Sequence, residues 1–99
     1  MSKYVLTNKA VKDLAIIWNY TFDTWPEKQA DKYYNDILKH CESLSKNPDQ
    51  GKKYSTLIQD LRGSKINKHI VFFRKTETNF IEIVRILHEQ MDLKSNLEK

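Results

Sequence analysis

The chain has 99 residues, 39% of them hydrophobic and 30% charged, with a net charge of +4, two glycines and two prolines. This composition is typical of one soluble domain, here expected to span residues 1–99, and it excludes a disordered or fibrous chain. The longest purely apolar runs, 15–18 and 70–73, are far too short to span a membrane, and the first residues lack the apolar stretch of a secretory signal. The single cysteine, Cys41, fits a reducing compartment, so we expect a cytoplasmic protein.

The first quarter of the chain predicts a strand followed by a helix. Lys3–Leu6 is rich in residues that favour strands, and Thr7 or Asn8 can then cap the start of a helix. After this cap, apolar and aromatic residues recur at steps of three and four, which defines one face of a helix. The face comprises Ala10, Leu14, Ile17, Trp18, Thr21, Phe22 and Trp25.

A second helix is predicted from Pro26 to the Asn47-Pro48 pair. Proline suits the first position of a helix and disfavours helix at the residue before it, so the two prolines mark the two ends. Two helices with almost no connection should pack as a hairpin, and a single kinked helix is the alternative. The apolar stripe of the second helix comprises Ala30, Tyr33, Tyr34, Ile37, Leu38, Cys41 and Leu44.

Beyond the second helix the apolar period changes from about 3.6 to 2, which favours strands. Residues 48–54 are polar with one glycine and are expected to form a loop. Leu61–Ile66, His69–Lys75 and Asn79–Leu87 are strand candidates, separated by short polar turns that suit antiparallel hairpins. Residues 70–73 are apolar on both faces, so that strand should be central.

These elements predict an α+β fold with the order β-α-α-β-β-β. We expect an antiparallel sheet of about four strands with a two-helix hairpin on one face.

The charge is unevenly distributed along the chain. Residues 1–50 carry seven basic and seven acidic side chains, whereas residues 51–75 carry seven basic side chains and one acid, Asp60. Such a local excess favours a nucleic acid, an acidic partner segment or an acidic protein surface as a partner. The alternative is a solvated basic edge that keeps the protein soluble.

Two further patterns could indicate a metal site or a nucleophile. His88-Glu89-x-x-Asp92 resembles an incomplete zinc motif with aspartate in place of the second histidine, so we expect no metal and no cofactor. Cys41 lies on an apolar stripe, which favours a core position over a nucleophile.

Arg85 interrupts an apolar strand, and by strict alternation it shares a face with Ile81, Ile83 and Leu87. A guanidinium there must find a partner or reach solvent. Either it pairs with a carboxylate such as Asp92 or caps carbonyl groups, or it lies on the open face of the sheet and contacts phosphate.

Motifs along nearly the whole chain resemble those of one family. They are Tyr4-x-Leu6-Thr7-x-x-Ala10-x-x-Asp13-Leu14, Ile17-Trp18-x-Tyr20-Thr21, Trp25-x-x-x-Gln29-Ala30-x-x-Tyr33, Pro48-x-x-Gly51-Lys52-x-Tyr54, His69-Ile70-Val71-Phe72-Phe73-Arg74 and Ile81-Glu82-Ile83-Val84-Arg85-Ile86-Leu87-His88-x-x-Met91-Asp92. In this order and spacing they resemble the ParE-type toxins of the RelE/ParE superfamily, which include plasmid stabilisation proteins.

The resemblance implies the toxin of a type II toxin–antitoxin system. A ParD-like antitoxin would neutralise it by folding a disordered C-terminal segment around it, giving a hetero-oligomer, and the toxin itself is a possible homodimer. Trp18 and Trp25 share a helix face; core packing is the default, and an exposed edge of this face is the candidate antitoxin-binding groove.

The superfamily hosts two activities: ParE-type members typically poison DNA gyrase, whereas RelE-type members cut mRNA on the ribosome. Arg62, Arg74 and Arg85 would stabilise phosphate charge in a metal-independent endoribonuclease. Ribosome-dependent relatives generally place a tyrosine or histidine acid–base group close to the C-terminus, and nothing after His88 fills that role. We therefore expect a gyrase inhibitor rather than an enzyme. The candidate target-binding residues are Arg62, Lys65, Lys68, Arg74, Arg85 and His88.

Overall fold

The computed structural model describes residues 3–24, 27–54, 59–76, 80–90 and 97. In this part of the chain, one strand precedes a pair of helices, and further strands follow the helices in the sequence. The elements are β1 (Lys3–Leu6), α1 (Asn8–Thr24), α2 (Glu27–Lys46), the 3₁₀ helix η1 (Pro48–Gln50), β2 (Lys52–Lys53), β3 (Arg62–Ile66), β4 (His69–Lys75) and β5 (Phe80–His88).

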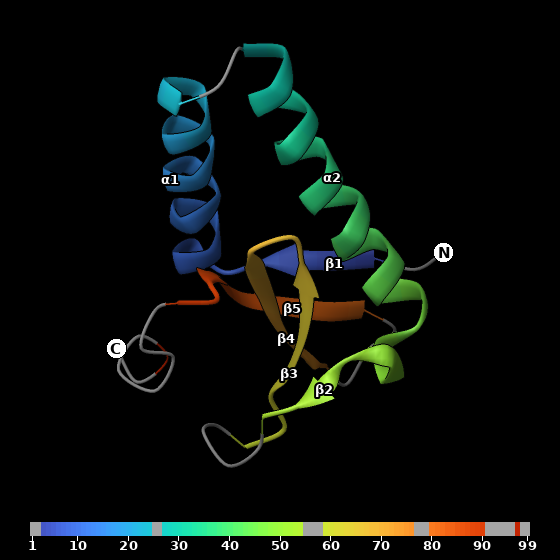
Figure 1. The fold of residues 1–99 in the computed structure, drawn as a ribbon. Coiled ribbons are helices and arrows are strands. Elements are labelled where there is room, and N and C mark those ends of the chain that lie inside the picture. The colour runs from blue at the N-terminus through green and yellow to red at the C-terminus, as the bar shows by residue number, and fades with distance from the viewer. Residues whose placement is uncertain (1–2, 25–26, 55–58, 77–79, 91–96, 98–99) are drawn as a thin grey trace.

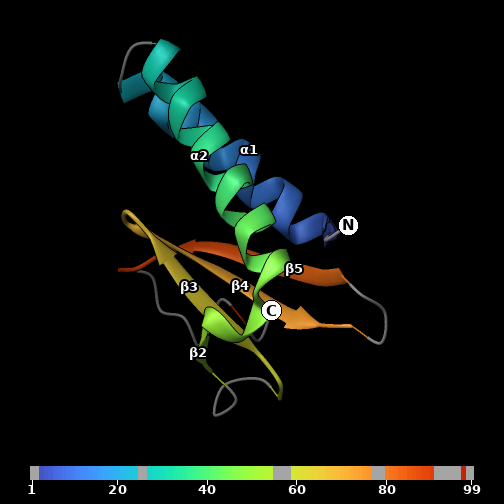
Figure 2. The ribbon, with the colours of Figure 1, turned by 90° about the vertical axis from the view of Figure 1, so that its right-hand side faces the viewer.

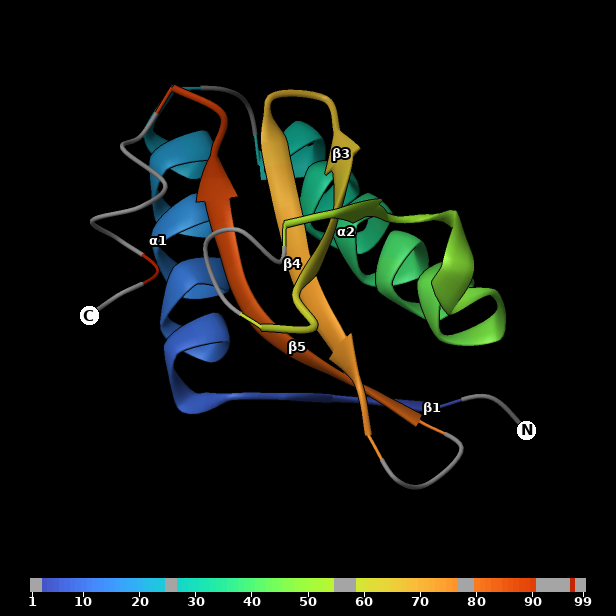
Figure 3. The ribbon, with the colours of Figure 1, turned by 90° about the horizontal axis from the view of Figure 1, so that it is seen from below.

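The two helices form a hairpin over one face of a five-stranded sheet with the strand order β1-β5-β4-β3-β2 (Figures 1 and 2). Figure 3 shows the opposite face of the sheet, which neither helix covers. The predicted α+β class and the helical hairpin are therefore confirmed, and a single kinked helix is excluded. Neither α1 nor α2, as far as they are described, combines the length and the apolar character needed to cross a membrane.

The sheet is mixed, so the prediction of an antiparallel sheet with about four strands was wrong in two respects. β1 pairs parallel to β5, from Lys3 opposite Phe80 to Leu6 opposite Ile83. These two strands lie at opposite ends of the chain, and no hairpin turn between them dictates an antiparallel direction. The fifth strand, β2, lies within the segment that was expected to be a loop, because two consecutive lysines show no alternation that could reveal a strand.

The main core lies between the helix hairpin and the sheet, and a second apolar cluster lies on the opposite face. Val71 and Phe73 of β4 pack under the helices, whereas Ile70 and Phe72 pack on the other face, and all four are buried. This confirms that β4 is central and apolar on both faces. The helix stripes supply the side of the main core that faces the sheet, with buried Ala10, Leu14, Ile17, Tyr33, Ile37, Cys41 and Leu44.

β5 contains a β-bulge at Val84, where its pairing with β4 shifts by one residue. The bulge resets the alternation of side chains, so Ile81 and Ile83 pack under the helices while Leu87 packs in the cluster on the opposite face. The expectation that Arg85 shares a face with all three was therefore wrong, because strict alternation does not allow for an extra residue.

We predict that Gly51→Ala destabilises the fold. A Cβ atom at Gly51 would lie 2.6 Å from the Cζ atom of Phe73, whose ring is fully buried. The free energy of unfolding should fall by about 1–3 kcal/mol, the usual cost of overpacking a core, as measured by urea denaturation. Gln50→Ala, at the exposed neighbouring position, is the matched control, and equal midpoints for the two variants would contradict the predicted clash.

Candidate functional site

The six candidate target-binding residues do not form one site. Arg62 lies opposite Phe73 in the β3–β4 pairing, so it projects from the helix-covered side of the sheet, and Arg74 projects from the other side. Arg74 forms an ion pair with Glu82 at 2.8 Å. The basic segment 51–75 therefore forms several separate groups rather than one continuous positive surface.

The first group lies where β3 begins and β4 ends, around the carboxylate of Asp49 on η1. Asp49 Oδ1 lies 2.6 Å from Lys75 Nζ and 3.8 Å from Arg62 Nη2. The hydrogen bond from Lys75 lowers the pKa of the Asp49 carboxyl below its ordinary value. Lys53 pairs with Arg62 across β2 and β3, which places a third cation on the same face. We call Lys53, Arg62, Lys75 and Asp49 the Asp49 cluster.

The second group lies at the turn between β3 and β4. Lys65 and Lys68 flank this turn and both are exposed. Lys65 Nζ lies 2.6 Å from a carboxylate oxygen of Glu89, and this contact lowers the pKa of the Glu89 carboxyl. The backbone N–H of Glu89 donates to the carbonyl oxygen of Lys68 at 2.8 Å. The lysines therefore help to hold the end of β5 against the turn.

Two histidines and a tyrosine lie beside this turn. The hydroxyl oxygen of Tyr33, on α2, is 2.6 Å from Nδ1 of His69, and the rings of His69 and His88 meet edge to face with 5.3 Å between centroids. Burial, with a further contribution from His88, lowers the pKa of His69 to about 4. His69 is therefore neutral at neutral pH.

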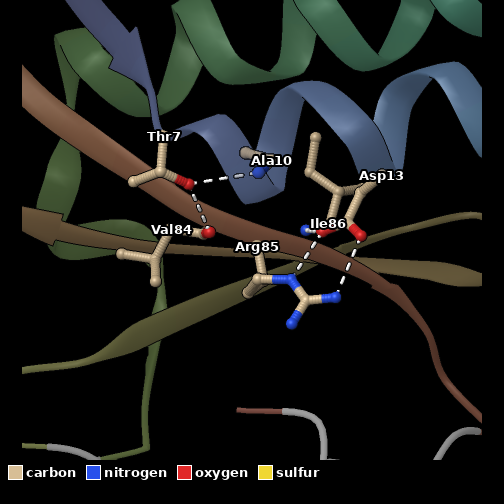
Figure 4. Close-up of polar contacts among 6 residues, drawn as sticks. All are labelled: Thr7, Ala10, Asp13, Val84, Arg85 and Ile86. Carbon is tan, nitrogen blue, oxygen red and sulfur yellow. Dashed lines mark hydrogen bonds and ion pairs between the residues drawn. The ribbon is translucent and has the colours of Figure 1, made fainter. Parts of the chain in front are cut away.

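Arg85 is held by Asp13 of α1 (Figure 4). Arg85 Nε and Nη2 donate to the two carboxylate oxygens of Asp13 at 2.8 and 3.0 Å, and the backbone N–H of Ile86 donates to the same carboxylate at 3.0 Å. The hydrogen bond to Asp13 raises the pKa of Arg85. Arg85 thus pairs with a carboxylate, but its partner is Asp13, whereas the suggested partner Asp92 lies outside the described residues.

Thr7 completes this connection between the start of α1 and β5. Its hydroxyl oxygen accepts a hydrogen bond from the N–H of Ala10 at 3.1 Å and donates one to the carbonyl oxygen of Val84 at 2.7 Å (Figure 4). Of the two predicted caps, Thr7 and Asn8, Thr7 is therefore the one that caps the helix. Past the end of β1, the side chains of Thr7 and Asp13 bind backbone groups along the edge of β5.

Trp18 lines a groove between the two helices rather than the main core. Its indole Nε1 donates to Asp31 on α2 at 3.2 Å. The groove has a volume of about 470 Å³ and is lined by Ala15, Trp18, Asn19, Asp31, Tyr34 and Asn35. Trp25, the other candidate antitoxin-binding residue, lies outside the described residues.

Cys41 is fully buried in the core, as predicted, and burial raises the pKa of its thiol to about 12. Of the zinc-like motif, His88 packs against His69 and Glu89 binds Lys65, while Asp92 is not described. Within the described ranges, no three side chains of the types that bind metals lie close enough to hold an ion.

The roles of Asp13 and Asp49 were not predicted from the sequence. Asp13 carried a usable signal, because it lies three residues after Ala10 and four before Ile17, on the apolar face of its helix. An acid on one apolar face and a base in an apolar strand, Arg85, indicate a buried ion pair. Asp49 carried no comparable signal, since its partners Arg62 and Lys75 lie on two strands whose register could not be predicted from the sequence.

The fold matches that of a solved chain titled "Chromosomal ParDE TA system from P. aeruginosa". The TM-score is 0.74, the sequence identity is 23%, and the match covers 89% of this chain and 96% of the other. At this identity the likeness shows a shared fold. The molecule therefore has the architecture of a small helix-hairpin-on-sheet domain found in that toxin–antitoxin system.

The family follows from sequence. The model of the family described as "ParE toxin of type II toxin-antitoxin system, parDE" matches residues 4–93. Toxin ParE1 of Mycobacterium tuberculosis is 31% identical over 96 residues, covering 97% of this chain and 98% of the relative. Toxin ParE1 of Caulobacter vibrioides is 30% identical over 97 residues, with 98% and 99% covered, and Toxin ParE of Escherichia coli is 32% identical over 97 residues, with 98% and 94% covered. The chain belongs to the ParE toxin family.

We predict that Asp13→Ala is strongly destabilising, because it removes a buried carboxylate that accepts three hydrogen bonds. The free energy of unfolding should fall by about 3–5 kcal/mol, the range found when one partner of a buried ion pair is removed. Combining Asp13→Ala with Arg85→Ala in a double-mutant cycle should give a coupling energy of about 1 kcal/mol or more. Arg74→Ala is the control, since its pair with Glu82 is exposed and should contribute about 1 kcal/mol or less. Additive losses for Asp13 and Arg85 would refute the pair.

We also predict a loss of stability between pH 6.5 and pH 5 that depends on His69. The folded-state pKa is about 4, whereas the unfolded value is about 6.5. Over this interval the unfolded chain binds the proton first, so stability falls as the pH falls. His69→Gln should flatten the dependence of the melting temperature on pH.

A change in stability above pH 5 reports on His69 rather than on the carboxyl groups, because carboxyl groups titrate at lower pH. His40 is the control position: burial also lowers its pKa, and His40→Gln should remove only its own contribution. An unchanged slope in His69→Gln would show that His69 is not the group responsible.

Proposed function

We propose that this ParE family member inhibits DNA gyrase in the cytoplasm, does not cleave RNA, and is neutralised by a ParD-like antitoxin encoded beside it. The family match over residues 4–93 and the three relatives named ParE support the toxin assignment. The solved ParDE system with the same fold supports an antitoxin partner.

The observation that carries the proposal is the placement of the three arginines that a nuclease would need. Arg85 donates two hydrogen bonds to Asp13, so its charge is compensated within the fold. Arg62 and Arg74 project from opposite sides of the sheet and each contacts a carboxylate. Stabilising the crowded phosphate of a cleavage transition state requires cations that converge on one point, whereas Arg62 lies on the other side of the sheet from Arg74, and Arg85 is bound to Asp13.

The remaining basic candidates suit a contact surface. Lys65 and Lys68 are exposed at the β3–β4 turn, and His88 lies next to them through its contact with His69. Exposed cations at a turn accelerate and orient association with a negatively charged surface. A gyrase complex holding DNA presents such a surface.

The groove beside Trp18 suits the antitoxin. It lies between two helices, has a volume of about 470 Å³, and combines the aromatic Trp18 and Tyr34 with polar groups of Asp31 and two asparagines. An amphipathic partner segment can bury apolar side chains in a groove of this kind while hydrogen-bonding at its rim.

We predict that the purified protein blocks supercoiling by gyrase or increases cleaved DNA complexes, and leaves mRNA on translating ribosomes intact. Adding the product of the adjacent reading frame should restore supercoiling and give a co-purifying complex. Both readouts follow from a toxin that acts by binding and is neutralised by binding.

The alternative, an mRNA endoribonuclease of the RelE type, predicts a different result. It would give cuts at defined codon positions that disappear in Arg62→Gln or Arg74→Gln, with supercoiling unaffected. That outcome would replace gyrase by the ribosome as the target. Failure of the adjacent product to bind or to restore activity would refute the antitoxin assignment.

A further inference from the structure

We propose that the Asp49 cluster is a recognition site for carboxylates, and that it binds an acidic peptide segment of the antitoxin. The proposed function supplies the identity of the partner. The evidence for the site is the geometry of its three cations, the cavity between them, and the carboxylate of Asp49, which already contacts two of these cations.

The cations converge because of strand register. Lys53 lies opposite Arg62 in the β2–β3 pair, and Arg62 lies opposite Phe73 in the β3–β4 pair. Lys75 is two residues beyond Phe73 and therefore lies on the same side of β4. Three adjacent strands thus each contribute one cation to the same side of the sheet.

A cavity lies among these cations. Its volume is about 370 Å³ and it is lined by Lys53, Asp60, Leu61, Arg62 and Lys75. This volume accommodates a side chain or two of a peptide. Leu61 adds an apolar contribution to the lining, which suits the methylene groups of an acidic side chain.

Asp49 shows that the site accepts a carboxylate. Lys75 Nζ and Arg62 Nη2 both contact its Oδ1 atom, at 2.6 and 3.8 Å. The Asp49 side chain is 70% exposed and comes from a three-residue helix, so an external carboxylate can replace it. Asp49 is in this sense an internal competitor for the same cations.

Arg62 has donor capacity left for a ligand. Its two contacts, at 3.8 Å to Asp49 and 3.4 Å to the carbonyl oxygen of Gly51, are both long, and a guanidinium carries five N–H donors in a fork that matches a carboxylate. Its side chain is only 21% exposed, so it is held in place before binding. Among the described carboxylates, none forms an ion pair with Lys53.

A peptide fits this site better than a nucleic acid. Asp60 lines the cavity and Asp49 contacts two of its cations, and their charges repel a continuous row of phosphates more strongly than a single carboxylate that takes the place of Asp49. A single cavity also suits one or two side chains rather than an extended backbone. The ligand is therefore a glutamate or aspartate within a peptide segment.

The test is an NMR titration of the isotopically labelled chain with a short blocked glutamate-rich peptide. Backbone amide signals of Lys53, Arg62 and Lys75 should shift, and affinity should fall as salt rises. The same peptide with glutamine in place of glutamate should not shift them. Arg62→Gln should weaken binding about tenfold, as expected for the loss of a charged hydrogen bond.

Asp49→Asn gives the sharper result. If Asp49 competes with the ligand, removing its charge should tighten peptide binding about threefold or more, the effect of freeing an exposed ion pair. Glu42→Gln is the matched control, because it removes one negative charge from an exposed position on α2 that lies outside the Asp49 cluster. Equal effects of the two substitutions would show that the overall charge of the protein attracts the peptide rather than this site, and would overturn the proposal.

Two further outcomes also count against the proposal. Tighter binding of a single-stranded oligonucleotide, with shifts at the same three residues, would make the site a phosphate site instead. Shifts confined to the β3–β4 turn would move the anion site to Lys65 and Lys68. Because the titration uses a synthetic peptide, its failure leaves the gyrase and antitoxin assignments standing, and their failure leaves the peptide result intact.

Discussion

The arrangement of the helices on the sheet depends on the hydrogen bonds that the carboxylate of Asp13 accepts. Asp13 is 7% exposed, and a buried charge is tolerated only when it is paired and hydrogen-bonded. Here it accepts two hydrogen bonds from Arg85 and one from the backbone of Ile86. Because Asp13 is on α1 and its partners are on β5, these bonds fix the first helix relative to the last strand. β1 leads directly into α1 and lies beside the same strand, β5.

This arrangement divides the basic residues into two kinds. Arg85 is held in a buried ion pair with Asp13, whereas the ion pairs formed by cations of the Asp49 cluster and of the β3–β4 turn are more exposed to solvent. Residues that hold the fold cannot also reorient toward a partner, whereas exposed side chains can.

Much of the fold could be predicted from the sequence, because its signals are local. The helix stripes, the Thr7 cap and the central position of β4 follow from periodicity and capping within a few residues. The direction of β1, the two-residue β2 and the bulge at Val84 could not be predicted, since each depends on pairing between distant segments. The same limit applies to the site. The candidate residues could be predicted, but their grouping depends on strand register. Asp13 lies on an apolar helix face and could have been found from the sequence, whereas the role of Asp49 depends on contacts between distant segments.

The shortest strand has a consequence for the molecule as a whole. β2 forms one edge of the sheet and consists of two exposed lysines. An edge strand of this length offers few free backbone groups, and two adjacent positive charges repel a second copy that approaches in the same way. The lysine edge therefore disfavours edge-to-edge association between copies of this chain when no partner covers it.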